Sequence, residues 1–410
     1  MPGSLRFSFY PPIYLAAMGS QPVDPCFRPW INKFADYIPD GIVRLRFLQA
    51  VAPPHLVPTP VRKRWRRTLR FVLPPLLAAP LLSFVLLRAT PHVHRTSAVV
   101  APVAPIRPPA PLPVPVDAAT PPAVWLVEHS LDSESYSNGL RIDNHLAVSN
   151  HPRSYRTFPL DPAGEPGQGS QPIGIVFHTT ESRQAPFEAQ QNRVLKRIGE
   201  SLLEYVQQKR AYNFVVDRFG RVYRIVVESD AANHAGYSVW SDERWLYLNL
   251  NESFLAISVE AETEAGQVEP EMSPAQVRAA AMLTEMLRSR YGISAANCVT
   301  HAQVSVNPSN MRVGYHTDWA SSFPFSAVGL PDNYARPLPA LVQFGFEADR
   351  SFDHAAGARM AAAVDLSEQQ EQDQAAALGL PLREYRKTLQ NRYRRLAAAY
   401  HSLSAAVTSD

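Results

Sequence analysis

The sequence predicts a mixed α+β domain, in which a central mixed β-sheet is flanked by helices. A transmembrane segment and a proline-rich linker are expected before this domain, and a helical tail after it. Three observations lead to this prediction. Short apolar runs of strand length alternate with segments whose apolar residues recur at helical spacing. A charge-free run at residues 71–87 follows a basic cluster, and prolines gather in one stretch behind it. A chain of 410 residues has room for one ordinary domain with such appendages.

Composition excludes several classes of protein and of site. The 40 basic and 37 acidic side chains give a net charge of only +3, so we predict no nucleic-acid partner. The two cysteines, Cys26 and Cys298, are too few for a disulfide framework or a cysteine-based metal cluster. Any bound metal must therefore use histidines and carboxylates.

The first part of the chain predicts a membrane anchor. Residues 62–88 join a basic flank to the apolar run 71–87, and the positive-inside rule leaves residues 1–61, a segment of unknown role, in the cytoplasm. As a helix the run reaches roughly 25 Å, a little short of the ~30 Å hydrocarbon core, and three prolines weaken it further. No small-residue cleavage site follows closely, so we favour an anchor over a cleaved signal, which would leave the protein secreted.

Residues 89–124 predict a stiff tether, because ten prolines lie between Pro91 and Pro122. A domain carried on this tether would be held outside the cytoplasm, in the periplasm or cell envelope. We expect that domain at residues 125–352, with its core at 170–325.

The elements of the domain follow in order. Ile173–His178 is a continuous apolar run that suits a central strand ending on a histidine. Apolar residues from Phe187 to Tyr205 then recur at helical spacing. Residues 212–227 predict a hairpin that turns at Phe219-Gly220.

A strand at residues 255–261 is expected next, with Ser258 and Glu260 on the same face. Ser273, Pro274 and Gln276 form a helix-start signal with a capping box, and that helix should end at Gly292. The tail at residues 353–410 reads as helical from Asp365 onward. Its apolar stripe favours docking on the domain, although its arginines could instead suit an anionic wall polymer or lipid surface.

Several residues have the chemistry of a catalytic site. A catalytic zinc takes three protein ligands and keeps one open position, and His178, His301 and Asp318 could supply the ligands. Glu260 interrupts an apolar strand, so it either faces solvent or is buried with a partner.

Taken together, five ordered blocks over about residues 170–325 resemble the zinc N-acetylmuramoyl-L-alanine amidases of the type 2 family, which includes phage amidase-lysozymes and peptidoglycan recognition proteins. The blocks are Val-Phe-His178-Thr-Thr-Glu, Tyr212-Asn-Phe-Val-Val-Asp-Arg-Phe-Gly-Arg-Val-Tyr, Asn233-His234-Ala-Gly, Ile257-Ser-Val-Glu260-Ala-Glu, and Thr300-His301-Ala followed by His316-Thr-Asp318. The resemblance implies Zn²⁺ bound by His178, His301 and Asp318. It also implies cleavage of the amide between N-acetylmuramic acid and L-alanine in peptidoglycan.

The same resemblance implies roles for other residues. Glu260 and Tyr212 fall where family members place an acid/base or water-orienting residue. His316 replaces the lysine that in many members stabilises the oxyanion, and it could itself be the third ligand, although the His-x-Asp order favours Asp318. Asn233 and His234 suit a loop that contacts the substrate. The alternative function is a peptidoglycan-binding or muropeptide-binding module of the same fold without catalysis.

Overall fold

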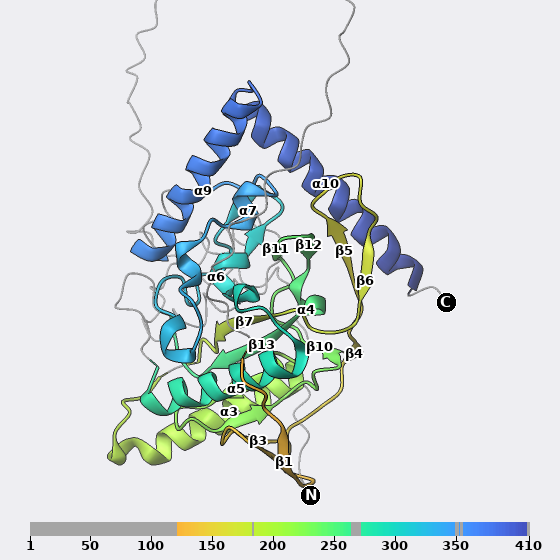
Figure 1. The fold of residues 1–410 in the computed structure, drawn as a ribbon. Coiled ribbons are helices and arrows are strands. Elements are labelled where there is room, and N and C mark those ends of the chain that lie inside the picture. Colours follow the sequence, from red (N-terminus) through yellow and green to blue (C-terminus); the bar gives the residue numbers. More distant parts are fainter. Residues whose placement is uncertain (1–120, 183, 264–271, 349–351, 353–355, 408–410) are drawn as a thin grey trace, which may run out of the picture. The chain divides into compact units, whose positions relative to one another are not determined.

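An eight-stranded β-sheet forms the centre of the computed structural model, which describes residues 121–407 apart from 183, 264–271, 349–351 and 353–355 (Figure 1). The strand order is β1 (Leu126–His129), β2 (Ser133–Tyr136), β3 (Arg141–Asp143), β9 (Val222–Arg224), β8 (Phe214–Val216), β13 (Phe254–Val259), β7 (Gly174–Thr179) and β14 (Cys298–Thr300). Neighbours among β8, β13, β7 and β14 are parallel, whereas β8 and β9 form an antiparallel hairpin. The predicted mixed sheet is therefore confirmed.

Smaller sheets and short helices surround the central sheet. A second sheet contains β11 (Val239–Ser241), β12 (Trp245–Leu248), β5 (Tyr155–Pro159) and β6 (Gly167–Gly169). Two strand pairs join β10 (Asp230–Ala231) to β4 (His151–Pro152) and β15 (Val306–Asn307) to β16 (Arg312–Val313). The short helices are η4 (Ala189–Gln191), α4 (Leu250–Ser253), η5 (Ala295–Asn297), α6 (His301–Val304), η6 (Phe325–Val328), η7 (Asn333–Ala335) and α7 (Pro339–Val342).

The two faces of the central sheet pack against different helices. Phe177 and Ile257 belong to the cluster that contains the buried residues of α5 (Pro274–Tyr291), while Val215 packs with Leu202 and its neighbours in α3 (Asn192–Lys209). Side chains at paired positions of adjacent strands point to the same face. Since Ser258 is paired with both Val215 and His178, these residues share the face covered by α3.

The two predicted helices of the domain are present, but one buries a different face. The capping box of Ser273 and Gln276 opens α5, and Gly292, at φ 65°, ends it, as predicted. In α3 the buried residues are Leu195, Leu202, Leu203 and Val206. Phe187 and Tyr205, which bound the predicted stripe, are 48% and 49% exposed. The helical periodicity was real, but the stripe was placed partly on the solvent side.

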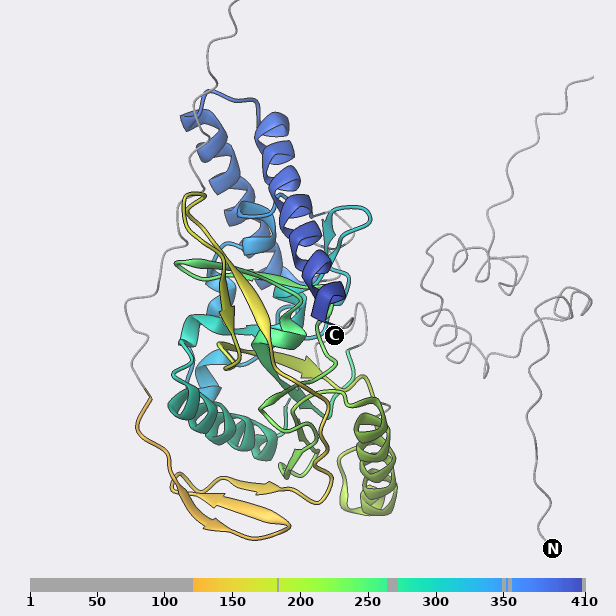
Figure 2. The same ribbon diagram turned by 90° about the vertical axis from the view of Figure 1, so that its right-hand side faces the viewer.

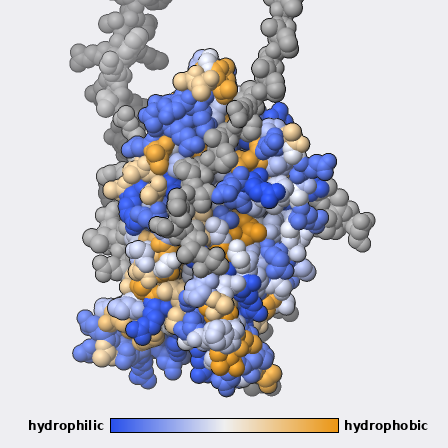
Figure 3. All heavy atoms as spheres, viewed as in Figure 1, coloured by the Kyte–Doolittle hydropathy of each residue, from blue (hydrophilic) through white to orange (hydrophobic). Residues whose placement is uncertain are grey.

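The predicted helical tail consists of two helices, α9 (Ala358–Ala377) and α10 (Leu382–Val407). They form a hairpin at the top of Figure 1 and lie side by side in Figure 2. The helical conformation is interrupted where Gly379 adopts φ 66° and Pro381 precedes α10. On α10, Tyr385, Leu389 and Tyr393 are buried, so the predicted docking of the apolar stripe is confirmed. Polar groups of α10 remain on the outer surface (Figure 3).

The predicted cytoplasmic segment 1–61, the anchor 62–88 and residues 89–120 of the linker lie outside the described residues. Among the residues that are described, no helix is long and apolar enough to cross a membrane. The anchor therefore stays a prediction from the sequence.

Candidate metal centre

His178 and His301 meet because their strands are parallel neighbours. His178 lies in β7 near its carboxyl end, and His301 is the first residue of α6, directly after β14. Thr300 of β14 is paired with Phe177 of β7, which places the two histidines at the same edge of the sheet. Asp318 reaches this edge from the loop after β16, where Trp319 adopts φ 56°.

The three side chains form a compact cluster that could hold a metal ion. Asp318 Oδ2 lies 3.2 Å from His178 Nδ1, and Asp318 Oδ1 lies 2.8 Å from His301 Nδ1. One potential ligand atom from each residue lies within 4.8 Å of the others, and all three residues are buried. Because both Nδ1 atoms face one carboxylate, an ion could contact all three residues from a single position.

The charge states of His178 and Asp318 suit metal binding. Burial, together with the nearby His301, lowers the pKa of His178 to about 4, so this imidazole is neutral near pH 7. Burial alone would raise the pKa of Asp318, but His301 and the hydrogen bonds from both histidines bring it well below its ordinary value. Neutral imidazoles and an ionised carboxylate are the forms that coordinate zinc.

His234 lies behind His178. Its Nδ1 is 3.1 Å from His178 Nε2, and its backbone N–H donates to Asn251 Oδ1 at 2.8 Å. A metal-binding histidine commonly uses its second nitrogen for such a hydrogen bond, which fixes the orientation of the ring. His234, which was predicted to contact the substrate, thus contacts His178, a candidate metal ligand. Asn233, the other predicted substrate residue, donates from Nδ2 to Lys209 O at the end of α3, at 2.9 Å.

His316 and Tyr212 flank the cluster. The ring of His316 stacks on His301 with centroids 4.5 Å apart, and burial lowers the pKa of His316 to about 4. Tyr212, at φ 63°, lies with its ring centroid 5.1 Å from that of His178. Burial, and then the charge of Asp318, raise the pKa of the Tyr212 phenol, so it remains a hydrogen-bond donor at neutral pH.

Glu260 is buried directly after β13, on the same face of the sheet as His178 and Ser258. Its Oε2 accepts a hydrogen bond from the backbone N–H of Arg218 at 3.0 Å, in the turn of the β8–β9 hairpin. Burial raises its pKa above the ordinary value. Of the two possibilities left open by the sequence, the structure shows the buried carboxylate with a partner.

A second carboxylate, that of Glu181, was not assigned a role from the sequence. Glu181 adopts φ 52°, and its carboxylate accepts hydrogen bonds from the Thr179 hydroxyl and the Thr263 backbone N–H. Burial raises the pKa of Glu181, and the charge of Asp318 raises it to a smaller extent. Glu181 therefore interacts electrostatically with the cluster. The only signal in the sequence was its position three residues after His178.

The sequence comparisons agree with this site. The profile of the N-acetylmuramoyl-L-alanine amidase family matches residues 168–318, a range that contains all three residues of the cluster. Among curated proteins, no sequence matches the chain.

The chain is also similar to several solved structures. One is the N-acetylmuramyl-L-alanine amidase AmiD from E. coli, in complex with anhydro-N-acetylmuramic acid-L-Ala-D-gamma-Glu-L-Lys (22% identity, 38% of this chain and 56% of that chain, TM-score 0.29). Another is AmpDh3 from Pseudomonas aeruginosa in complex with anhydromuramic pentapeptide (18% identity, 41% of this chain and 60% of that chain, TM-score 0.30). A third is the Drosophila peptidoglycan recognition protein SD (14% identity, 39% of this chain and 84% of that chain, TM-score 0.24). The match thus spans less than two thirds of the length of each of the first two proteins.

The profile match confirms the resemblance expected from the five sequence blocks: residues 168–318 match the N-acetylmuramoyl-L-alanine amidase family.

Proposed function

We propose that the protein is a zinc-dependent amidase that hydrolyses the amide between N-acetylmuramic acid and L-alanine in peptidoglycan. The observation that carries this proposal is the cluster of His178, His301 and Asp318, at one edge of the sheet and inside the region that matches the amidase family. Two imidazoles and one carboxylate leave a fourth zinc position free, as catalytic zinc sites require.

The donor set fits zinc better than Mg²⁺ or Ca²⁺, which prefer sites made wholly of oxygen ligands. When bound, zinc supplies a Lewis acid and a source of hydroxide near neutral pH. His178 Nδ1, His301 Nδ1 and one oxygen of Asp318 would hold it, with His234 orienting the ring of His178.

The remaining residues would move protons and bind the developing charge. Hydrolysis adds hydroxide to the carbonyl carbon and a proton to the leaving amine, so one group must carry that proton. Glu260 is our candidate, because burial raises its pKa toward the value a base needs at neutral pH. Tyr212 and His316, which flank the cluster, would donate hydrogen bonds to the carbonyl oxygen as it becomes negative.

We propose further that residues 71–87 anchor the protein in a membrane with the amidase domain outside the cytoplasm, where peptidoglycan is found. The basic flank of this segment and the proline-rich stretch behind it support that placement. If the signal were cleaved, the domain would be secreted to the same side.

One observation favours the alternative function, a module that binds muropeptides without cutting them. The carboxylate of Glu260 is hydrogen-bonded to the hairpin turn rather than to a member of the cluster. A protein that lacked a usable proton carrier could still recognise the same substrate.

Digestion of peptidoglycan separates the two functions. We expect the purified full-length protein in detergent to release peptides with a free L-alanine amino terminus, identified by mass. A chelator should abolish the release, and added zinc should restore it. Tight binding of muropeptides with no released peptide would support the binding module instead.

A further inference from the structure

One side chain of α4, that of Asn251, holds the loop that carries His234. The backbone N–H groups of His234 and Ala235 both donate to Asn251 Oδ1, at 2.8 and 2.5 Å. These two N–H groups flank the Cα atom of His234, so one acceptor fixes the backbone on both sides of this residue. The direction in which the His234 side chain leaves the loop therefore depends on Asn251.

The segment that carries Asn251 is itself fixed by a buried arginine. Arg153 is 3% exposed, and its guanidinium donates to Asn251 O and Glu252 O, at 3.2 and 2.7 Å. It also donates, at 3.0 Å, to Asp230 O in β10, the strand that leads into the His234 loop. A shift of α4 would leave donors of a buried charge without acceptors, which is costly. Asn251 is therefore a rigid support for the loop.

The direction of the His234 side chain matters because its ring shares a proton with the ring of His178. His178 Nδ1 faces Asp318, and His178 Nε2 lies 3.1 Å from His234 Nδ1. A neutral imidazole has one N–H and one acceptor nitrogen. If Nδ1 of His178 binds a metal ion, the proton is on Nε2, and His234 Nδ1 has to accept it in a hydrogen bond. The backbone of His234 thus decides whether an acceptor stands behind the metal ligand.

We propose that Asn251 is a positioning residue of the metal centre, which acts on metal affinity through His234 and His178. This inference rests on the proposed function, because it concerns the same cluster. Removing the side-chain oxygen of Asn251 leaves two N–H groups without their acceptor and frees the His234 ring to turn. The ring of His178 then loses the hydrogen bond that fixes its orientation, and metal ligands that lose such a partner bind more weakly.

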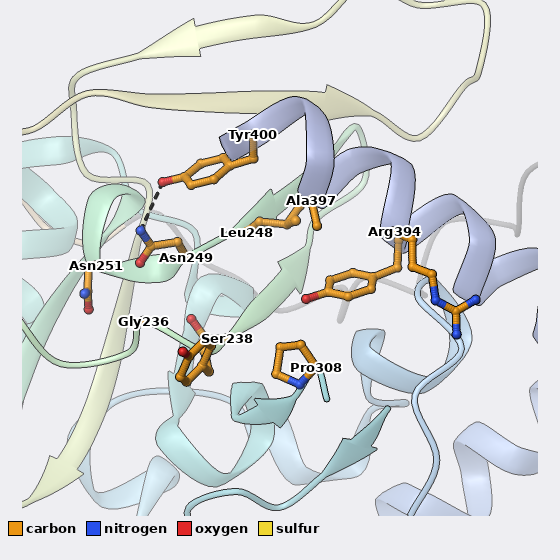
Figure 4. A pocket seen from close by; sticks show the side chains of 11 residues that line it. Gly236, Ser238, Leu248, Asn249, Asn251, Pro308, Arg394, Ala397 and Tyr400 are labelled. Carbon is orange, nitrogen blue, oxygen red and sulfur yellow. Dashed lines mark hydrogen bonds between the residues drawn. The ribbon is translucent and has the colours of Figure 1, made fainter. Parts of the chain in front are cut away.

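The pocket under α10 offers a matched control (Figure 4). Asn249 and Asn251 both line this pocket, together with Ala397 and Tyr400 of α10. Figure 4 shows the amide of Asn249 bonded to the Tyr400 hydroxyl, a contact of 3.1 Å. Tyr400→Phe therefore removes a hydrogen bond from the same pocket and leaves both hydrogen bonds of Asn251 to the His234 loop in place.

The first test measures the zinc affinity of the full-length protein by competition with a chelator. We expect Asn251→Ala to weaken zinc binding about tenfold, as is typical when a group that orients a metal ligand is lost. Asn251→Asp keeps an oxygen acceptor and should bind zinc as tightly as wild type, and so should Tyr400→Phe. In a protein that already carries His234→Ala, Asn251→Ala should cause no further loss, because its effect passes through His234. Unchanged affinity in Asn251→Ala, or the same loss in the His234→Ala background, would overturn the inference.

The second test needs no metal, so the inference and the proposed function fail separately. In metal-free protein with ¹⁵N-labelled histidines, NMR should show one imidazole N–H between His178 and His234 that exchanges slowly with water, assigned by its loss in His234→Ala. Asn251→Ala should lose this signal and Asn251→Asp should keep it. If wild type binds no zinc and cuts no peptidoglycan, the proposed function fails, and this signal still decides on Asn251. Its persistence in Asn251→Ala, or its absence from wild type, overturns the role of Asn251. Asn251→Gln, which moves the acceptor by one methylene, replaces Asn251→Ala in both tests if circular dichroism shows that the latter does not fold.

Discussion

The charge states of Asp318 and His178 depend on their surroundings in the cluster. The hydrogen bonds from His178 and His301 keep the buried Asp318 ionised, and burial keeps His178 neutral. Removing either histidine therefore takes away one possible metal ligand and one group that lowers the pKa of Asp318. His316 is not one of the three residues whose potential ligand atoms lie close together. Its ring stacks on that of His301 instead.

A prediction about the metal follows. Purified protein should contain about one zinc, and His178→Ala, His301→Ala and Asp318→Ala should each lose it. His316→Ala should retain it, because only a stacking contact is removed. Zinc content measured by mass spectrometry checks this. Full zinc in Asp318→Ala together with zinc loss in His316→Ala would show that the third ligand is His316.

The proton carrier is tested by two matched substitutions. Glu260→Gln preserves volume and can still accept from Arg218, but it cannot take a proton. Its kcat should fall by at least about 10², with zinc content and KM little changed. Glu181→Gln, at the carboxylate that interacts with Asp318, serves as the comparison and should cost less. The opposite ranking in steady-state assays would assign the role to Glu181.

The pH dependence has a definite sign. Burial raises the pKa of Glu260 above its ordinary value of 4.5. As a base it must be ionised, so kcat/KM should fall as the pH drops through this raised pKa rather than near 4.5. A pH–rate profile, with zinc content checked at each pH, measures the acid limb. Tyr212→Phe should keep that limb, and Glu260→Gln should flatten it.

At the scale of elements, the domain depends on tertiary packing of its helices. Leu389 of α10 is 3% exposed and packs with Tyr385 and Ala375, so α10 is held to α9 by a small apolar cluster. The ion pair of Arg386 with the fully buried Glu371 joins the same two helices at 2.6 Å.

We therefore expect Leu389→Ala to lower the free energy of unfolding by about 2–4 kcal/mol, through lost burial and a residual cavity. Leu366→Ala on α9, where the side chain is 44% exposed, is the control and should change stability by less than about 0.5 kcal/mol. Urea unfolding of the purified protein measures both. Equal effects would mean that α10 does not contribute its apolar stripe to the fold.

At the scale of the whole molecule, the predicted topology has its own test. The basic cluster at residues 62–70 precedes the apolar run, so the chain after Arg88 should lie outside the cytoplasm. A reporter that is active only outside the cytoplasm, fused after Asp410, should be active. Activity of a cytoplasmic reporter at that position would contradict the predicted orientation. The domain would then lie on the side of the membrane away from peptidoglycan, its proposed substrate.

Much of the fold could be predicted because local signals and the final structure agree. The capping box at Ser273, the glycine end at Gly292 and the hairpin turn at Gly220 each depend on residues close in sequence. The small sheets were not predicted, because strands of two to five residues such as β5 and β11 give too little periodicity. The buried face of α3 was misplaced for a related reason: the sheet, not the helix, decides which side is covered.

The sequence by itself determined the resemblance of residues 168–318 to the amidase family, the residue types of the cluster and the order in which they occur. Short motifs carry this information because their residues are close together in the chain. Only the tertiary structure decided which of these residues meet. Parallel pairing of β7 with β14 joins His178 to His301, and a loop returns Asp318 between them. The contact of His234 with His178, the carboxylate of Glu181 and the pocket under α10 arise from residues far apart in the chain, so no local pattern could specify them.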